Sequence, residues 1–232
     1  MGEKIKALRA AFPHTLPILT GYLALGAAYG VLLSTKGYGV VWALLTSTFI
    51  YAGSMQFVSV GMLGMGFHPL SACLMTLMVN ARHFFYGIAM LDRLGGTGRL
   101  KPYLIFAMSD ETFSLLCSSP PPEGVSRKWF LFFTALLDHS YWIAGSVAGG
   151  LLGGLVSFNT AGIDFVLTAM FVVIFINQWK ATSNHLPVLI GLGAALLCRI
   201  VLGSEKFLIP AMIVILVLVT LLRGPIEKRG DL

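Results

Sequence analysis

Charged side chains are scarce in this sequence of 232 residues. Asp, Glu, Lys and Arg together make up 11% of the chain, whereas hydrophobic residues make up 56%. Because soluble domains carry about 25% charged residues, this composition excludes an ordinary soluble protein. The net charge of +6 is scattered over short loops and both tails, and no basic patch alternates with aromatic residues, so we do not expect nucleic-acid binding. The sequence instead predicts a protein that crosses a membrane several times.

The sequence also lacks the motifs of metal sites and of nucleophilic catalysis. Its three cysteines have no CxxC spacing and lie in or at the end of apolar segments, which is typical of packing residues. The five histidines follow no HExxH or comparable pattern, and no GxSxG elbow presents a serine nucleophile. We therefore expect no metal ion, no cofactor and no enzymatic activity.

No polar stretch is long enough to form a separate soluble domain. Residues 1–13 resemble a short basic amphipathic lead-in, and the longest polar link, Ser118–Lys128, contains three consecutive prolines that stiffen it. A helix needs about 20 apolar residues to cross a bilayer, and eight apolar segments approach that length. The sequence thus predicts an all-α integral membrane protein with about eight transmembrane helices. The apolar segments are 16–34, 39–66, 69–91, 102–119, 129–156, 163–180, 186–203 and 207–222.

The second apolar segment is longer than one straight crossing requires, and polar residues interrupt it near its centre. Gly53 allows the helix to kink or break there, and the side chains of Ser54 and Gln56 can satisfy backbone groups freed by the break. Secondary transporters bind substrate at such discontinuous helices. We expect one broken helix near Gly53. The alternative is a continuous helix whose Ser54 and Gln56 hydrogen-bond to a neighbouring helix.

Two parts of the chain carry similar motifs in the same order, which predicts an internal repeat. Its halves are 14–117 and 129–222, within a single transmembrane domain that covers 1–232. Whether the repeat is parallel or inverted depends on how often each half crosses the membrane. The glycine pairs also allow close approach of helix backbones. The matched motifs are Gly26-x-x-x-Gly30 with Gly145-x-x-x-Gly149, Thr46 and Gln56-Phe57 with Thr168 and Gln178-Trp179, and Pro69 and Arg82 with Pro187 and Arg199.

Ionisable residues occur inside four apolar segments, where they are costly and mark functional sites by default. Asp110 and Glu111 are adjacent, so a helix directs them to different faces and we expect them to have different partners. Structural roles are the alternatives: Arg82 could snorkel to an interface or pair with an acid, and Asp164 could oppose a helix dipole. The four groups are Asn80-Ala81-Arg82-His83, Asp110-Glu111, Asp138-His139 and Asp164.

Seven sequence blocks, taken in order, resemble the AzlC family, which comprises the large subunits of bacterial branched-chain amino acid exporters. The match covers about residues 13–175, and the last two apolar segments add little to it. The blocks are Pro17-x-x-x-Gly21, Gly26-x-x-x-Gly30, Tyr51-Ala52-Gly53-Ser54-x-Gln56-Phe57, Asn80-x-Arg82-His83, Asp110-Glu111-Thr112-Phe113, Asp138-His139-x-Tyr141-Trp142 and Gly162-x-Asp164-Phe165.

The resemblance implies a multi-pass secondary transporter of the bacterial inner membrane. Its substrates would be valine, leucine and isoleucine, with methionine as a further one, and a small hydrophobic membrane subunit of the AzlD type would be its partner. We expect proton antiport to drive export. The alternatives are a channel or facilitator, and a non-transporting membrane scaffold for the small subunit.

An exported amino acid needs donors for its carboxylate, acceptors for its ammonium group and an apolar pocket for its side chain. The candidate substrate-binding residues are Tyr51, Gly53, Ser54, Gln56, Phe57, Asn80, Arg82 and Phe113. Proton coupling needs groups that gain and lose a proton, and buried carboxyls and histidine are suited to this. The candidates for proton coupling are Asp110, Glu111, Asp138 and His139, which the sequence does not rank.

Overall fold

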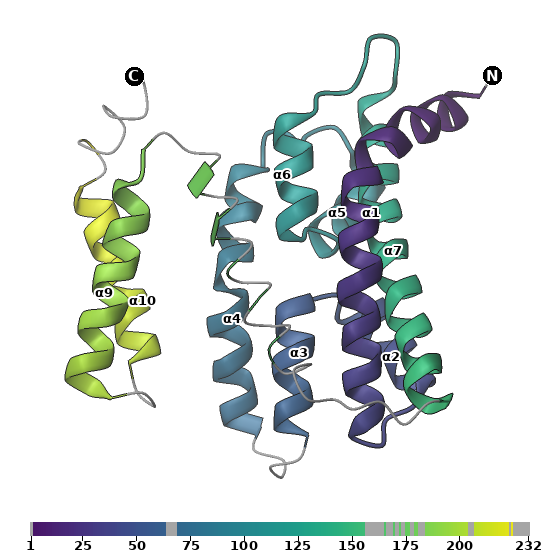
Figure 1. The fold of residues 1–232 in the computed structure, drawn as a ribbon. Helices are drawn as coiled ribbons and strands as arrows, with labels where there is room; N and C mark the ends of the chain where they lie inside the picture. Colours follow the sequence, from purple (N-terminus) through teal and green to yellow (C-terminus); the bar gives the residue numbers. More distant parts are fainter. Residues whose placement is uncertain are drawn as a thin grey trace. The chain divides into compact units, whose positions relative to one another are not determined.

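The computed structural model describes residues 2–63, 69–155, 184–203 and 207–222, with isolated positions between 165 and 180 and at 224. Every element of secondary structure in this part of the chain is a helix, so the predicted all-α class is confirmed for it (Figure 1). The chain divides into two compact units, residues 1–167 and 168–232. The predicted residues Asp164, Thr168 and Gln178 lie outside the described residues. The internal repeat therefore stays a prediction.

Helix α1, Glu3–Thr35, is the longest element, with 33 residues. It contains Pro13 and Pro17, each of which removes one backbone hydrogen bond, and Figure 1 shows the helix bending in its N-terminal part. The expected lead-in of residues 1–13 is therefore not separate from the first apolar segment. Of the described helices, α1 is the one that is both long and apolar enough to cross a membrane by itself.

Helix α7, Arg127–Leu155, packs along α1 more extensively than any other pair of described helices (Figure 1). Glycines on both helices make this possible. A Cβ atom at Gly26 would lie 2.9 Å from the backbone nitrogen of Ser146, and one at Gly145 would lie 2.7 Å from the carbonyl oxygen of Tyr22. The expectation that the glycine pairs bring helix backbones together is confirmed for these two helices.

The predicted break near Gly53 is confirmed. Helix α2, Val40–Phe49, ends before it, and helix α3, Gly53–Met62, begins at the glycine. Tyr51 in the link has a φ of 44°, a left-handed conformation that is uncommon for a residue other than glycine. A Cβ atom at Gly53 would lie 3.1 Å from the ring of Trp142, so glycine also allows close packing here.

A second break divides the fourth apolar segment, which we had expected to be continuous. After the short turn η1, Gly98–Leu100, helix α5 covers Lys101–Phe106 and helix α6 covers Asp110–Ser118. The Ser109 side chain caps α6 by accepting a hydrogen bond from the backbone N–H of Thr112. Asp110 and Glu111 thus lie in the first turn of a helix rather than in the middle of one.

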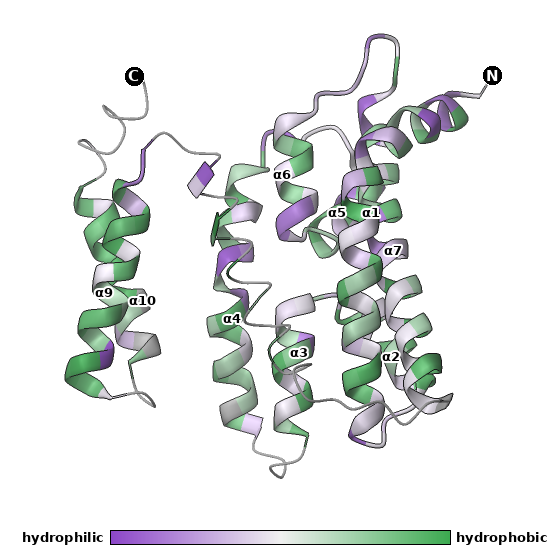
Figure 2. Ribbon diagram, viewed as in Figure 1, coloured by the Kyte–Doolittle hydropathy of each residue, from purple (hydrophilic) through white to green (hydrophobic). Residues whose placement is uncertain are grey.

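Helix α4, Pro69–Ala89, contacts α3 and carries the polar group that contains Arg82. Figure 2 shows hydrophilic residues within α4 and at the start of α6, in helices that are otherwise largely hydrophobic. In the second unit, helix α9, Leu186–Leu202, packs against helix α10, Leu208–Leu221.

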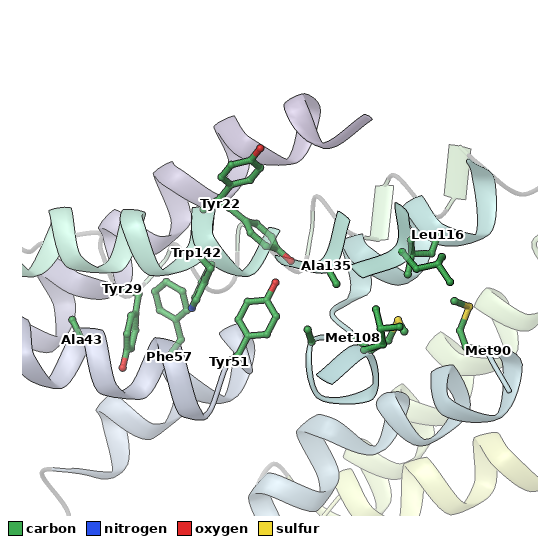
Figure 3. Packing of buried hydrophobic residues seen from close by; sticks show 14 of the residues in the cluster. Tyr22, Tyr29, Ala43, Tyr51, Phe57, Met90, Met108, Leu116, Ala135 and Trp142 are labelled. Carbon is green, nitrogen blue, oxygen red and sulfur yellow. The ribbon is translucent and has the colours of Figure 1, made fainter. Parts of the chain in front are cut away.

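Aromatic side chains form the buried core beside the first break (Figure 3). Tyr29 and Phe57 meet edge to face with their ring centroids 5.7 Å apart, and Tyr22 meets Trp142 in the same way at 5.5 Å. These contacts join α1, α3 and α7. Tyr51, in the link between α2 and α3, belongs to the same buried cluster.

Candidate functional site

Arg82 on α4 contacts the first turns of both α3 and α6. Its Nη2 atom donates a hydrogen bond of 2.9 Å to Ser54 Oγ, and its Nε atom lies 3.0 Å from Asp110 Oδ1. The second contact is an ion pair by distance, although its angle does not meet hydrogen-bond geometry. One guanidinium group thus connects the beginnings of the two helices that follow the breaks.

Asp110 and Glu111 have different partners, as predicted from their adjacent positions. Asp110 Oδ1 accepts a hydrogen bond of 2.7 Å from the hydroxyl of Tyr86 and pairs with Arg82. Glu111 Oε2 instead lies 2.7 Å from the hydroxyl of Tyr22 on α1. The expected alternative of an ion pair between Arg82 and an acid is therefore present in the structure.

Hydroxyl groups connect Glu111 to Asp138 on α7. The Tyr22 hydroxyl lies 2.7 Å from Ser109 Oγ, which lies 3.0 Å from Thr112 Oγ1, and that hydroxyl donates to Asp138 Oδ2 at 2.8 Å. The Asp138 side chain is fully buried, and its Oδ1 atom has no hydrogen-bond partner in the described part of the chain.

Sequence reasoning missed Tyr22, Ser109 and Thr112. Ser109 carried a usable signal, because a serine followed directly by two acidic residues is typical of a helix N-terminus. Tyr22 and Thr112 carried none, since a single hydroxyl group in an apolar segment is common. Only the fold brings these three side chains together.

His139 has both ring nitrogens engaged. Nε2 lies 3.1 Å from the carbonyl oxygen of Ser47, and Nδ1 lies 3.1 Å from the hydroxyl of Tyr103. A carbonyl oxygen can only accept, so Nε2 carries the ring proton, and in the neutral ring Nδ1 accepts a hydrogen bond from the Tyr103 hydroxyl. The ring of Tyr51 lies against the imidazole with centroids 4.3 Å apart.

Gln56 is buried, and both ends of its amide are bonded. Nε2 donates to Ser47 Oγ at 3.1 Å, and Oε1 accepts from the indole N–H of Trp142 at 2.9 Å. The expected alternative of a continuous helix is wrong because of the break, but the bonds of Gln56 to neighbouring helices that it included are present. Phe57 is also buried, and it packs against Tyr29.

Three of the candidate substrate-binding residues retain polar atoms without a hydrogen bond among the described residues. They are Tyr51 through its hydroxyl, Asn80 through Oδ1 and Arg82 through Nε. Phe113 stacks on Tyr86 with centroids 4.4 Å apart, which brings it close to the Asp110 contact. The described residues contain no group of three or more His, Cys, Asp and Glu side chains that could hold a metal ion.

Comparisons with known proteins find relatives that match most of this chain. The sequence profile of the family described as "AzlC protein" matches residues 17–156. The chain is 49% identical to "Branched-chain amino acid transport protein AzlC" of Bacillus subtilis, over 96% of this chain and 87% of that protein. No solved structure matches the chain significantly.

Further relatives are named as membrane proteins. An "Uncharacterized membrane protein" of Helicobacter pylori strain 26695 is 44% identical over 98% of this chain and its own full length. The "Inner membrane protein YgaZ" of Escherichia coli is 27% identical over 73% of this chain and 72% of that protein. The chain is accordingly a membrane protein and not an enzyme. It belongs to the AzlC family of transport proteins.

Proposed function

We propose that the protein is a secondary transporter that exports branched-chain amino acids across the inner membrane by proton antiport. The observation that carries this proposal is the position of Arg82, which joins the first turns of two helices and pairs with the partly buried Asp110. A cation next to helix N-termini attracts a carboxylate, and nearby acids can take up a proton. The named function of the Bacillus subtilis relative supports the substrate class.

The substrate carboxylate would bind between Arg82 and the start of α3. The first backbone N–H groups of a helix have no acceptor within it, and Ala52 at the N-cap offers no side-chain hydrogen bond. Asp110 already places a carboxylate oxygen against the guanidinium group, so the geometry suits this chemistry. We infer that the substrate carboxylate takes the place of Asp110 at Arg82.

The substrate ammonium group needs acceptors, which Asn80 and the released Asp110 carboxylate supply. Asn80 Oδ1 has no hydrogen-bond partner among the described residues. Phe113 is partly buried and offers apolar surface to an aliphatic side chain, while the buried Tyr51, Gln56 and Phe57 support the site from within the core. One methylene group changes affinity by only about 1–3 kcal/mol in an apolar pocket. We therefore expect valine, leucine, isoleucine and methionine all to be transported.

Proton coupling would use the acidic residues around the two breaks. Asp110, Glu111, Asp138 and His139 remain the candidates. Asp110 is engaged by Arg82 and Tyr86, and the hydrogen bonds of His139 suit a neutral ring. Glu111 and Asp138 are joined to each other through hydroxyl groups, whereas Asp110 pairs with Arg82, so we assign the transported proton to Glu111 and Asp138.

The proposal extends to topology and assembly. The half-helices α2 and α3, and likewise α5 and α6, would cross the membrane as pairs, which keeps about eight crossings in all. A small hydrophobic subunit of the AzlD type would complete the exporter.

The test is uptake of labelled valine into inverted membrane vesicles, with and without the small subunit and with and without an uncoupler. Accumulation that the uncoupler abolishes is the expected result. Equilibration without accumulation would indicate a facilitator. If folded protein with its small subunit gives no valine flux, the proposal fails and a scaffold becomes the better interpretation.

A further inference from the structure

A continuous line of hydroxyl groups connects two carboxyl groups on different helices. It runs from Glu111 Oε2 through the hydroxyls of Tyr22, Ser109 and Thr112 to Asp138 Oδ2. The four contacts measure 2.7, 2.7, 3.0 and 2.8 Å. Each distance lies in the range of a hydrogen bond between oxygen atoms.

The hydroxyl groups are oriented in one direction. Ser109 Oγ donates to Thr112 Oγ1, and Thr112 Oγ1 donates to Asp138 Oδ2. The single proton of the Tyr22 hydroxyl can point either to Ser109 or to Glu111. When it points to Ser109, every donor in the line faces Asp138, and Tyr22 can accept a hydrogen bond from a protonated Glu111.

We propose that this line is a proton relay that moves one proton between Glu111 and Asp138, an assignment that rests on the proposed function of proton-coupled export. Protonated Glu111 gives its proton to the Tyr22 oxygen while Tyr22, Ser109 and Thr112 each pass on their own. Asp138 Oδ2 gains a proton and Glu111 becomes a carboxylate. Each hydroxyl breaks one O–H bond and forms one, so the relay returns to neutral hydroxyl groups.

Burial makes the relay necessary for Asp138. Its side chain has no exposed surface, whereas Glu111 is partly exposed. The hydrogen bond from Thr112 is the one described for the Asp138 carboxyl, since Oδ1 has no partner among the described residues. A proton from the Glu111 side therefore reaches Asp138 through Thr112.

The electrostatic surroundings favour one shared proton. Glu111 and Asp138 interact electrostatically, and it is costly to ionise both carboxyls of such a pair when one of them is fully buried. Tyr51, in the link before α3, and Tyr103, on α5, also interact electrostatically with Asp138, and neither adds a positive charge. The other charges that act on Glu111 are those of Asp110 and Arg82, which pair with each other. His139 follows Asp138 on α7 and points to Ser47 and Tyr103.

The first test is Thr112→Val, which removes the hydroxyl with little change of shape, and Thr112→Ser, which keeps it. Thr134→Val is the matched control, because Thr134 is buried on α7 and its hydroxyl has no partner among the described residues. We expect Thr112→Val to lower gradient-driven valine uptake about 100-fold, as the loss of a positioned proton donor does. Valine counterflow, which needs no net proton movement, falls far less. Thr112→Ser and Thr134→Val keep gradient-driven uptake.

The second test does not depend on valine transport. The infrared carboxyl band of Asp138, identified by its loss in Asp138→Asn, reports the exchange of its proton after transfer to heavy water. Exchange should be fast in the wild-type protein, in Thr112→Ser and in Thr134→Val, and slow in Thr112→Val. Tyr22→Phe keeps the aromatic packing and removes the first hydroxyl, so it should also slow exchange.

The two readouts separate the relay from the transport function. If the wild-type protein does not move valine but Asp138 exchanges slowly only in the hydroxyl-deleted variants, the relay stands and the proposed function fails. If Thr112→Val and Tyr22→Phe both exchange as fast as the wild-type protein, the relay is wrong, whatever the valine flux.

Discussion

The Nε atom of Arg82 lies 3.0 Å from Oδ1 of Asp110, so a cation on α4 holds the first acid of α6. The same guanidinium group donates to Ser54 at the start of α3. Under the proposed function, the carboxylate of a zwitterionic substrate exchanges with the Asp110 carboxylate at this pair. Substrate binding would thereby release Asp110, the residue next to Glu111 in sequence.

Replacing Arg82 by lysine keeps the positive charge but loses the planar group that reaches two partners. We expect the KM for valine to rise by about ten- to 100-fold in Arg82→Lys, because one ammonium group cannot contact Ser54 and Asp110 in the same way. Concentration-dependent uptake of labelled valine into inverted vesicles measures this change. An unchanged KM would mean that Arg82 does not bind the substrate.

Removing the positive charge of Arg82 altogether tests how much the ion pair between Arg82 and Asp110 contributes to stability. Arg82→Ala leaves the partly buried Asp110 carboxyl without its cation. Removing one partner of a fully buried ion pair lowers the free energy of unfolding by about 3–5 kcal/mol. Because this pair is partly exposed, we expect a smaller decrease. Adding Asp110→Asn should restore part of the thermal stability in detergent and none of the transport. If the double variant transported valine normally, the pair would have no role in binding.

The close contact between α1 and α7 predicts a difference between two glycines on one helix. A Cβ atom at Gly149 would collide with the backbone of Ala27, whereas one at Gly154 meets nothing within 4 Å. Gly149→Ala should destabilise the protein by about 1–3 kcal/mol through overpacking. Gly154→Ala, the matched control, should be neutral or slightly stabilising. Thermal unfolding in detergent distinguishes the two, and equal stabilities would contradict the described packing.

Gln56 is expected to support the site rather than contact the substrate. Gln56→Leu leaves the indole N–H of Trp142 without its acceptor, and an unsatisfied buried donor costs about 1–3 kcal/mol. The variant should therefore show lower thermal stability, with a KM for valine close to that of the wild-type protein. A large rise in the KM for valine at unchanged thermal stability would instead indicate that Gln56 contacts the substrate.

The first break could be predicted from sequence and the second could not. Gly53 lies beside polar residues in the centre of a long apolar segment, so composition alone marks the position. Ala107 and Met108 continue the apolar pattern of their segment, and only the capping serine that follows them signals a new helix. The expected continuous segment was wrong because weak capping signals are easily hidden within apolar sequence.

The hydrogen-bond partners of the site residues could likewise be predicted only in part from the sequence. The angle between neighbouring residues on a helix was enough to predict that Asp110 and Glu111 differ in their partners. It could not predict that Tyr22, far away in sequence, lies beside Glu111, because periodicity gives the face of a helix and not the neighbour of that face. The length of α1 was missed for a related reason: Pro13 and Pro17 suggest a boundary, but a helix can bend at prolines and continue.

The proposed function requires branched-chain amino acids and protons to move in opposite directions through one protein. The most direct measurement is the internal pH of proteoliposomes that contain the protein and its small subunit, after an imposed valine gradient and with the membrane potential clamped. The account predicts that valine entry drives proton exit in the wild-type protein, and that Asp138→Asn abolishes this proton movement. Valine entry with no change in internal pH in the wild-type protein would contradict the account.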